Sequence, residues 1–187
     1  MVNLRGVTQE KKDECRIRGN QAADEFIMFI ETEYGGKCYL STPESDMFEH
    51  VDFDYITKDG NKIRIDFKSI KYISKFADDD SPPDQYNILE LVSVNGNDGW
   101  IYGYADYICF ETLDSWLWVP RKKLVQFVDE NVKNESPIIG TICTPMYHLR
   151  RYQRINRKDV IVVVTKEELI KLSIKISKKP SYVTEKV

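Results

Sequence analysis

Residues 51–68 read VDFDYITKDGNKIRIDFK, and this stretch decides the fold. Apolar and charged residues alternate on both sides of KDGN, whose Asp-Gly step suits a tight turn that needs a positive φ. The stretch therefore predicts two strands paired as a hairpin. Because successive side chains of a strand point to opposite faces, Asp52 and Asp54 share one face of the first strand. Asp66 and Lys68 share one face of the second.

Extended and helical patterns alternate along the rest of the chain. A helix is expected from Thr8 or Asp13 to Tyr34, because apolar residues recur there at helical spacing and Gly35-Gly36 follows. The two strands of the hairpin are expected within residues 50–57 and 62–70. Further strands are expected at residues 37–40, 88–93, 100–102, 107–111, 116–119 and 160–164.

Two later helices and two loops complete these expectations. Pro120 suits the start of one helix, and Thr165 with Glu168 forms a capping box for the other. The polar segments 41–46 and 76–84 are expected as loops.

The fold class follows from this order of elements. A chain of 187 residues is expected to form one domain. Its order of elements suits the α+β or the α/β class. We expect α/β, with a central mixed β-sheet flanked by helices. The core is expected over about residues 13–173. A flexible basic tail is expected over about residues 178–187, because little beyond Lys178 is available for burial.

The composition excludes several classes of protein. Four cysteines lie far apart without a CxxC pair, and there are only two histidines, so neither a disulfide framework nor a zinc site is expected. No apolar run approaches the ~18–20 residues of a membrane span, and the N-terminal sequence lacks the apolar region of a signal peptide. We therefore expect a cytoplasmic protein without a membrane partner.

Charge is distributed unevenly along the chain. Residues 1–119 contain 12 basic and 23 acidic residues, whereas residues 120–187 contain 15 basic and 7 acidic ones. This asymmetry indicates a site that gathers carboxylates beside a surface that could face a polyanion. Ordinary solvated surface is the alternative explanation.

The charged faces of the hairpin can carry chemistry. Three carboxylates and one ammonium group are crowded among strongly apolar neighbours, and carboxylates so placed repel one another. A hard divalent cation would relieve that repulsion. An exposed hairpin with its charges in water is the alternative.

The order of these elements resembles the PD-(D/E)xK nucleases, which include restriction endonucleases and Holliday-junction resolvases. The resemblance rests on Asp52, followed after a hairpin by Asp66-Phe67-Lys68, with a helix ahead of them. It covers roughly residues 13–119. Segments 49–53, 99–108 and 152–159 are also similar to uncharacterised phage members of the superfamily.

The resemblance implies a restriction-endonuclease-like fold and a phosphodiesterase site. Asp52 and Asp66 would hold Mg²⁺ or Mn²⁺, which polarises the scissile phosphate and neutralises the leaving oxyanion. Lys68 would orient the attacking water. Asp54 shares the face of Asp52 and is the alternative metal ligand. Glu90 would supply a further catalytic group or ligand, or is a carboxylate at the margin of the sheet.

The sequence departs from the family pattern at two positions. Family members often carry Glu on the first helix about four residues after a Gly, but Ala23 follows Gly19 at that spacing. Val51 replaces the proline that often precedes the first aspartate. The Ala23 departure leaves open whether the site is active.

A basic cluster near the C-terminus is the expected nucleic-acid surface. Guanidinium groups bind phosphate bidentately, and phosphate contacts supply most sequence-independent affinity. A solvated basic loop is the alternative. The cluster comprises Arg150, Arg151, Arg154, Arg157 and Lys158.

These features together predict a Mg²⁺-dependent deoxyribonuclease, and an endonuclease rather than an exonuclease. DNA is the expected partner, with RNA left open, and the frequent dimers of the family leave a homodimer open. A phage-encoded protein would act in the host cytoplasm. The alternative function is a catalytically inactive nuclease-fold module that binds nucleic acid or a host protein.

Overall fold

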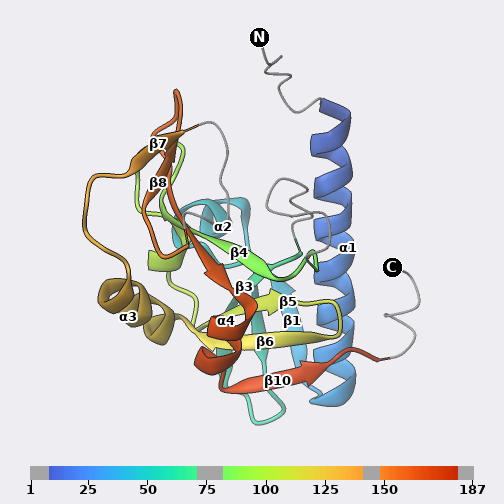
Figure 1. Cartoon of the computed structure of the whole chain (residues 1–187). Helices are drawn as coiled ribbons and strands as arrows, with labels where there is room; N and C mark the ends of the chain where they lie inside the picture. The colour runs from blue at the N-terminus through green and yellow to red at the C-terminus, as the bar shows by residue number, and fades with distance from the viewer. Residues whose placement is uncertain (1–8, 71–81, 141–147, 181–187) are drawn as a thin grey trace.

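A long first helix, α1 (Gln9–Glu33), lies along one face of a six-stranded mixed sheet (Figure 1). The computed structural model describes residues 9–70, 82–140 and 148–180 of the chain. The helix ends where Gly35 and Gly36 adopt positive φ angles of 71° and 84°. Because glycine lacks a Cβ, it adopts this left-handed backbone without strain and lets the chain turn back into the sheet.

The first sheet contains the hairpin of residues 51–68. All neighbouring strands in it run antiparallel, except β3 and β5, which are parallel. In the hairpin Phe53 lies opposite Ile65, and Asp54 lies opposite Arg64. The order across the sheet is β1 (Lys37–Leu40), β2 (Phe53–Ile56), β3 (Lys62–Lys68), β5 (Tyr107–Glu111), β6 (Ser115–Pro120) and β10 (Lys175–Lys178).

A second sheet of four strands lies on the face of the first sheet that α1 leaves uncovered. Its order is β4 (Tyr86–Val92), β9 (Val160–Thr165), β8 (Tyr152–Arg154) and β7 (Ile138–Gly140). The shorter elements are α2 (Pro43–Glu49), the 3₁₀-helix η1 (Trp100–Tyr102), α3 (Arg121–Asn131) and α4 (Lys166–Leu172).

Two hydrophobic cores are separated by the first sheet. Under α1 the core is rich in aromatic rings, with Phe26 stacked on Phe67 at 5.1 Å between centroids and packed near Trp116 at 5.5 Å. Between the two sheets the core is mainly aliphatic, and Leu124 of α3 and Leu169 of α4 complete it. The charged face of the hairpin therefore adjoins the inter-sheet core.

The structure confirms a single α/β domain with a central mixed sheet. The strands at 37–40 and 107–111 have the expected bounds, and α1 and the hairpin form where expected. The capping box is also confirmed, because Thr165 Oγ1 accepts from Glu168 N while a Glu168 carboxylate oxygen accepts from Thr165 N. One face of the central sheet is covered by α1, as expected. The other is covered by the second sheet together with α3 and α4.

Several local expectations were wrong. The loop expected at 41–46 contains the start of α2, and the strand expected at 100–102 is η1. The helix α2 begins at Pro43, whose fixed φ suits a first helical position. In η1 the backbone N–H of Tyr102 donates to Gly99 O at 3.0 Å, so local bonds replace strand pairing. Of the loop at 76–84, residues 76–81 lie outside the described residues.

The C-terminal boundary lies later than expected. Lys178 belongs to β10, and the Lys179 ammonium binds Glu111 Oε1 at 2.7 Å with its side chain only 4% exposed. The structured part of the chain therefore includes these residues. Residues 181–187 of the expected tail lie outside the described residues.

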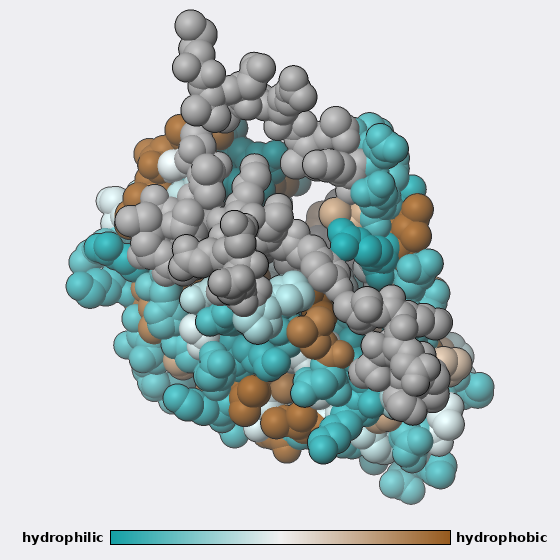
Figure 2. Space-filling model, turned by 45° about the vertical axis from the view of Figure 1, so that its right-hand side comes forward, coloured by the Kyte–Doolittle hydropathy of each residue, from teal (hydrophilic) through white to brown (hydrophobic). Residues whose placement is uncertain are grey.

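The described surface has no extended apolar face in the view of Figure 2. Hydrophilic residues predominate there, and hydrophobic ones form small separate groups wherever the atoms are not grey. In the described part of the chain, no helix has both the length and the apolar character of a membrane span.

Candidate active site

The alternation of β3 places its charged residues on the inter-sheet side. Ile65 and Phe67 belong to the aromatic core under α1, so Asp66 and Lys68 point away from that helix. In the parallel pairing, Asp66 lies beside Ile108 of β5. Since Ile108 belongs to the inter-sheet core, Asp66 is placed at the margin of an apolar environment.

Asp66 is the most deeply buried of the expected site residues, with 1% of its surface exposed. Its Oδ1 forms an ion pair with the Lys68 ammonium, whereas its Oδ2 has no hydrogen-bond partner among the described residues. Burial raises the pKa of Asp66 to about 8. The charge of Asp52 also raises this pKa, and the charge of Lys68 lowers it.

Asp52 lies beside Asp66 on the neighbouring strand. It directly precedes β2, and the register of the hairpin would place it opposite Asp66. Its Oδ2 accepts from the backbone N–H of Phe67 at 2.6 Å, and its own N–H donates to Ile65 O at 2.9 Å. These bonds hold the Asp52 carboxylate against β3, so that two carboxylates converge.

Lys68 joins this pair from the same face. Its ammonium contacts Asp66 and lies 4.8 Å from the centroid of the Trp100 ring. Trp100 belongs to η1 and packs near Phe110 at 6.2 Å between centroids. The lysine is thus held between a carboxylate and an aromatic face, which attracts cations. No sequence pattern indicated Trp100 as a neighbour, because it is 32 residues away in the chain.

Asp54 is not brought to this pair. Its Oδ2 forms an ion pair with the Lys62 ammonium at 2.5 Å, and it lies opposite Arg64 in the hairpin. It is therefore displaced along the strand toward the turn. The geometry favours Asp52 over Asp54 as the partner of Asp66.

Glu90 is also not brought to this pair. It lies on β4 in the second sheet, where its neighbours Leu89 and Leu91 belong to the inter-sheet core. By strand alternation Glu90 points to the opposite face of that sheet, away from the first sheet. The sequence indicated a strand here but not which sheet it would join.

The helix position of the family carboxylate is occupied by an apolar contact. Ala23 is half-buried and packs against the aromatic core under α1. The helix passes the end of β3 at Gly19, where a Cβ would lie 3.6 Å from Ser69 Oγ. Residue 23 therefore supplies no carboxylate to the pair formed by Asp52 and Asp66.

The paired carboxylates Asp52 and Asp66 fit a hard divalent ion. Such ions prefer carboxylate oxygens and complete their coordination with water or phosphate. The buried, unpartnered Oδ2 of Asp66 is a suitable donor atom. Within residues 9–70, 82–140 and 148–180, however, no group of three or more His, Cys, Asp or Glu side chains is arranged around a metal position. A bound ion would therefore have two protein carboxylates at most from this part of the chain.

The basic cluster is divided by its contacts. Arg154 Nε donates to Asp159 Oδ2 at 2.6 Å, and Asp159 is fully buried. Arg151 Nη1 donates to Asn134 Oδ1 at 2.8 Å. The remaining members are exposed and are Arg150, Arg157 and Lys158. The one acid that follows the basic run, Asp159, was the sequence signal that part of the cluster is structural.

Comparisons of this chain with protein-family models, with curated proteins and with solved structures found no match. We therefore infer function from the geometry of the described residues.

Proposed function

We propose that this protein is a metal-dependent nuclease of the PD-(D/E)xK type that hydrolyses phosphodiester bonds of DNA. The observation that carries the proposal is the convergence of Asp52, Asp66 and Lys68 on neighbouring strands. This is the arrangement that the resemblance implies for those three residues. We also propose that the protein acts inside a host cell, on DNA rather than RNA. It would act as an endonuclease and as a homodimer.

The three residues have two roles in this proposal. Asp52 and Asp66 hold Mg²⁺ or Mn²⁺, and the bound ion supplies Lewis-acid activation of the phosphate. Lys68 lies on the same face and offers its ammonium to the attacking water and to the developing negative charge. The Trp100 ring and the Asp66 carboxylate limit where that ammonium can lie.

Nicking of supercoiled plasmid tests this proposal. The purified chain is incubated with plasmid in Mg²⁺, in Mn²⁺ and in EDTA, beside the variants Asp52→Asn and Asp66→Asn. The matched control is Asp54→Asn, which makes the same chemical change two residues from Asp52. Metal-dependent nicking that both site variants lose and the control retains supports the proposal. Equal activity in all four proteins would place the chemistry elsewhere.

A non-catalytic nucleic-acid-binding module is the second candidate. This candidate is favoured by the surroundings of Asp66, which is almost fully buried and already forms an ion pair with Lys68. The described residues also provide no third carboxylate. Salt-sensitive DNA binding without any Mn²⁺ binding in calorimetry would select this candidate. Binding to a host protein without affinity for DNA would instead indicate a module that binds proteins.

A further inference from the structure

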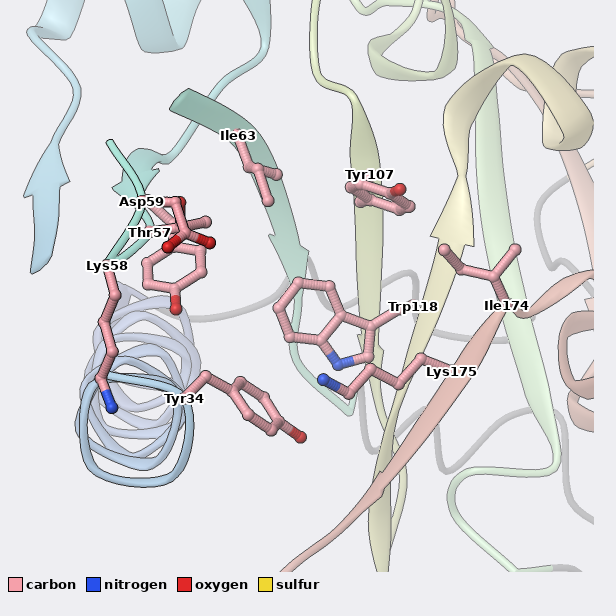
Figure 3. A pocket seen from close by; sticks show the side chains of 10 residues that line it. Tyr34, Thr57, Lys58, Asp59, Ile63, Tyr107, Trp118, Ile174 and Lys175 are labelled. Carbon is pink, nitrogen blue, oxygen red and sulfur yellow. The ribbon is translucent and has the colours of Figure 1, made fainter. Parts of the chain in front are cut away.

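A pocket of about 460 Å³ opens on the α1 side of the first sheet, opposite to Asp66. It forms where α1 has ended and no longer covers the strands. Pockets of this size accommodate small organic ligands. Its walls come from the residue after α1, from β2, the hairpin turn, β3, β5 and β6, and from the start of β10 (Figure 3).

Aromatic rings form much of the pocket wall. Trp118 lies 6.4 Å from Tyr34 and 6.1 Å from Tyr107 between ring centroids, in edge-to-face arrangements. The polar edge of Trp118 is already satisfied, since its Nε1–H donates to Ser177 Oγ at 3.0 Å. The rings therefore present π faces and edges to the pocket, which favours a planar aromatic occupant.

Two hydroxyl groups of the wall are also engaged within the fold. Tyr55 donates to Gly35 O at 2.7 Å, and the Tyr34 hydroxyl lies 2.9 Å from Ser177 Oγ. These bonds fix the rings in place. The charged residues of the pocket can then select a polar group of a ligand.

Two ammonium groups and one carboxylate belong to the lining, from Lys58, Lys175 and Asp59. The Lys175 ammonium lies 3.2 Å from the centroid of the Tyr34 ring and 5.5 Å from that of Trp118. Within the described ranges, no carboxylate forms an ion pair with Lys58 or Lys175. Figure 3 shows Lys175 between Trp118 and Tyr34, with Lys58 on the far side of the pocket.

Lys58 is positioned by a glycine. Its Cε would lie only 1.8 Å from a Cβ at Gly35, so the lysine side chain occupies the space that any other residue there would fill. The excess of positive charge around an aromatic wall fits a negatively charged ligand.

We propose that this pocket binds a small planar aromatic anion, such as an aromatic carboxylate. The ring system lies against Trp118 and Tyr107, and the anionic group is bound by Lys175. This site is separate from the nuclease site and uses none of its residues.

Nuclear magnetic resonance titration of the full chain tests this proposal with 2-naphthoate as the probe. Two further ligands separate the contributions of charge and aromaticity. 2-Naphthylmethanol keeps the aromatic rings without the charge, and cyclohexanecarboxylate keeps the charge on a non-aromatic ring. We expect 2-naphthoate to shift the Trp118 indole N–H signal and to bind more tightly than either of these two ligands. Equal binding of the neutral alcohol would overturn the anion assignment. No shift at millimolar 2-naphthoate would overturn the site.

A matched pair of variants locates the charge. Lys175→Met should weaken 2-naphthoate binding by about five- to tenfold and leave 2-naphthylmethanol binding unchanged. Lys178→Met makes the same change at an exposed position of the same strand outside the pocket, and it should leave both affinities unchanged. Equal weakening by both variants would mean that the anion responds only to the general charge of the protein.

Discussion

Two buried aspartates, Asp66 and Asp159, each bind a basic side chain that the sequence indicated as a functional group. Asp66 binds Lys68, and Asp159 binds Arg154. Both carboxylates keep one oxygen without a hydrogen-bond partner among the described residues. The difference is the neighbour: Asp66 has a second carboxylate, Asp52, beside it.

This difference separates a candidate cation site from a structural ion pair. Once Asp66 has lost its proton, two carboxylates beside one ammonium leave negative charge that a metal ion can neutralise. The Arg154 pair instead closes a short turn, in which Arg157 N donates to Arg154 O at 3.1 Å. A buried aspartate paired with a basic side chain can thus belong to a candidate cation site or to a structural ion pair. The presence of a second carboxylate distinguishes the two.

Removal of the cation should destabilise the protein strongly at the Arg154 pair and much less at the Lys68 pair. Arg154→Leu leaves the buried Asp159 without its counter-charge, at a cost of about 3–5 kcal/mol in the free energy of unfolding. Lys68→Met should cost less than about 1 kcal/mol at neutral pH, because the raised pKa of Asp66 lets it become neutral. Urea denaturation of both variants checks this ranking. Arg157→Leu, at an exposed position, is the control, with an expected change within about 0.5 kcal/mol.

The nuclease proposal predicts a large loss of activity at Lys68. Lys68→Met should slow metal-dependent cleavage roughly 100-fold or more, because it removes a charge beside the developing oxyanion. Arg154→Leu should act only through folding, so its specific activity per folded molecule should remain close to that of the parent. Rates of plasmid nicking, corrected for the folded fraction, make the comparison. Similar losses in both variants would remove the distinction between the two pairs.

The stability of the metal-free protein should depend on pH through Asp66. Its pKa is raised in the folded state from 3.8 to about 8, so the folded protein holds this proton more tightly than the unfolded chain. The resulting stabilisation is fully present below about pH 3.8 and is lost as the pH rises to about 8. The Asp66→Asn variant has no carboxyl group to titrate here, so its stability does not depend on pH through this residue.

The stability of Asp66→Asn relative to the parent should therefore increase between about pH 5 and pH 8, by at most about 1.4 kcal/mol per pH unit. Urea denaturation in EDTA across this range measures the difference. Asp54→Asn, whose parent carboxylate pairs with Lys62, serves as the control. A difference between Asp66→Asn and the parent that does not change with pH would contradict the raised pKa.

The exposed members of the basic cluster should give the smallest effect. Simultaneous replacement of Arg150, Arg157 and Lys158 by Gln should flatten the salt dependence of duplex DNA binding, by about 0.9 in slope for each phosphate that is no longer neutralised. Arg154 is left intact because Asp159 binds it. The control replaces three exposed lysines elsewhere, namely Lys122, Lys123 and Lys133. Equal flattening by both triple variants would show that the cluster acts only through net charge.

The placement of Asp52, Asp66 and Lys68 could be predicted from the sequence because it depends on short-range geometry. Alternation along β3 puts Asp66 and Lys68 on one face, and the tight turn brings β2 alongside. The position of Glu90 away from this pair could not be predicted, for the opposite reason. Its strand leaves the hairpin and pairs with β9, about 70 residues away, and no local pattern specifies that partner.

The strands β7, β8 and β10 could not be predicted from local patterns either. They contain three or four residues each, and β10 reads KISK, with too few apolar residues to mark a strand. Pairing with β6 rather than propensity makes β10 a strand. Similarly, the presence of Asp159 beside the basic run does not specify which arginine will pair with it, because that choice depends on how the turn folds.

The short strand β10 also determines which edge the first sheet presents to solvent. It supplies the last hydrogen-bonded neighbour of β6, and Ser177 accepts the indole N–H of Trp118. A chain ending at Ser173 would leave β6 as an open edge, with unpaired backbone groups beside buried tryptophans. Such an edge is a template for strands of other molecules. The sheet instead ends on β10, a short strand with a lysine at each end, which is a poorer template for such pairing than β6.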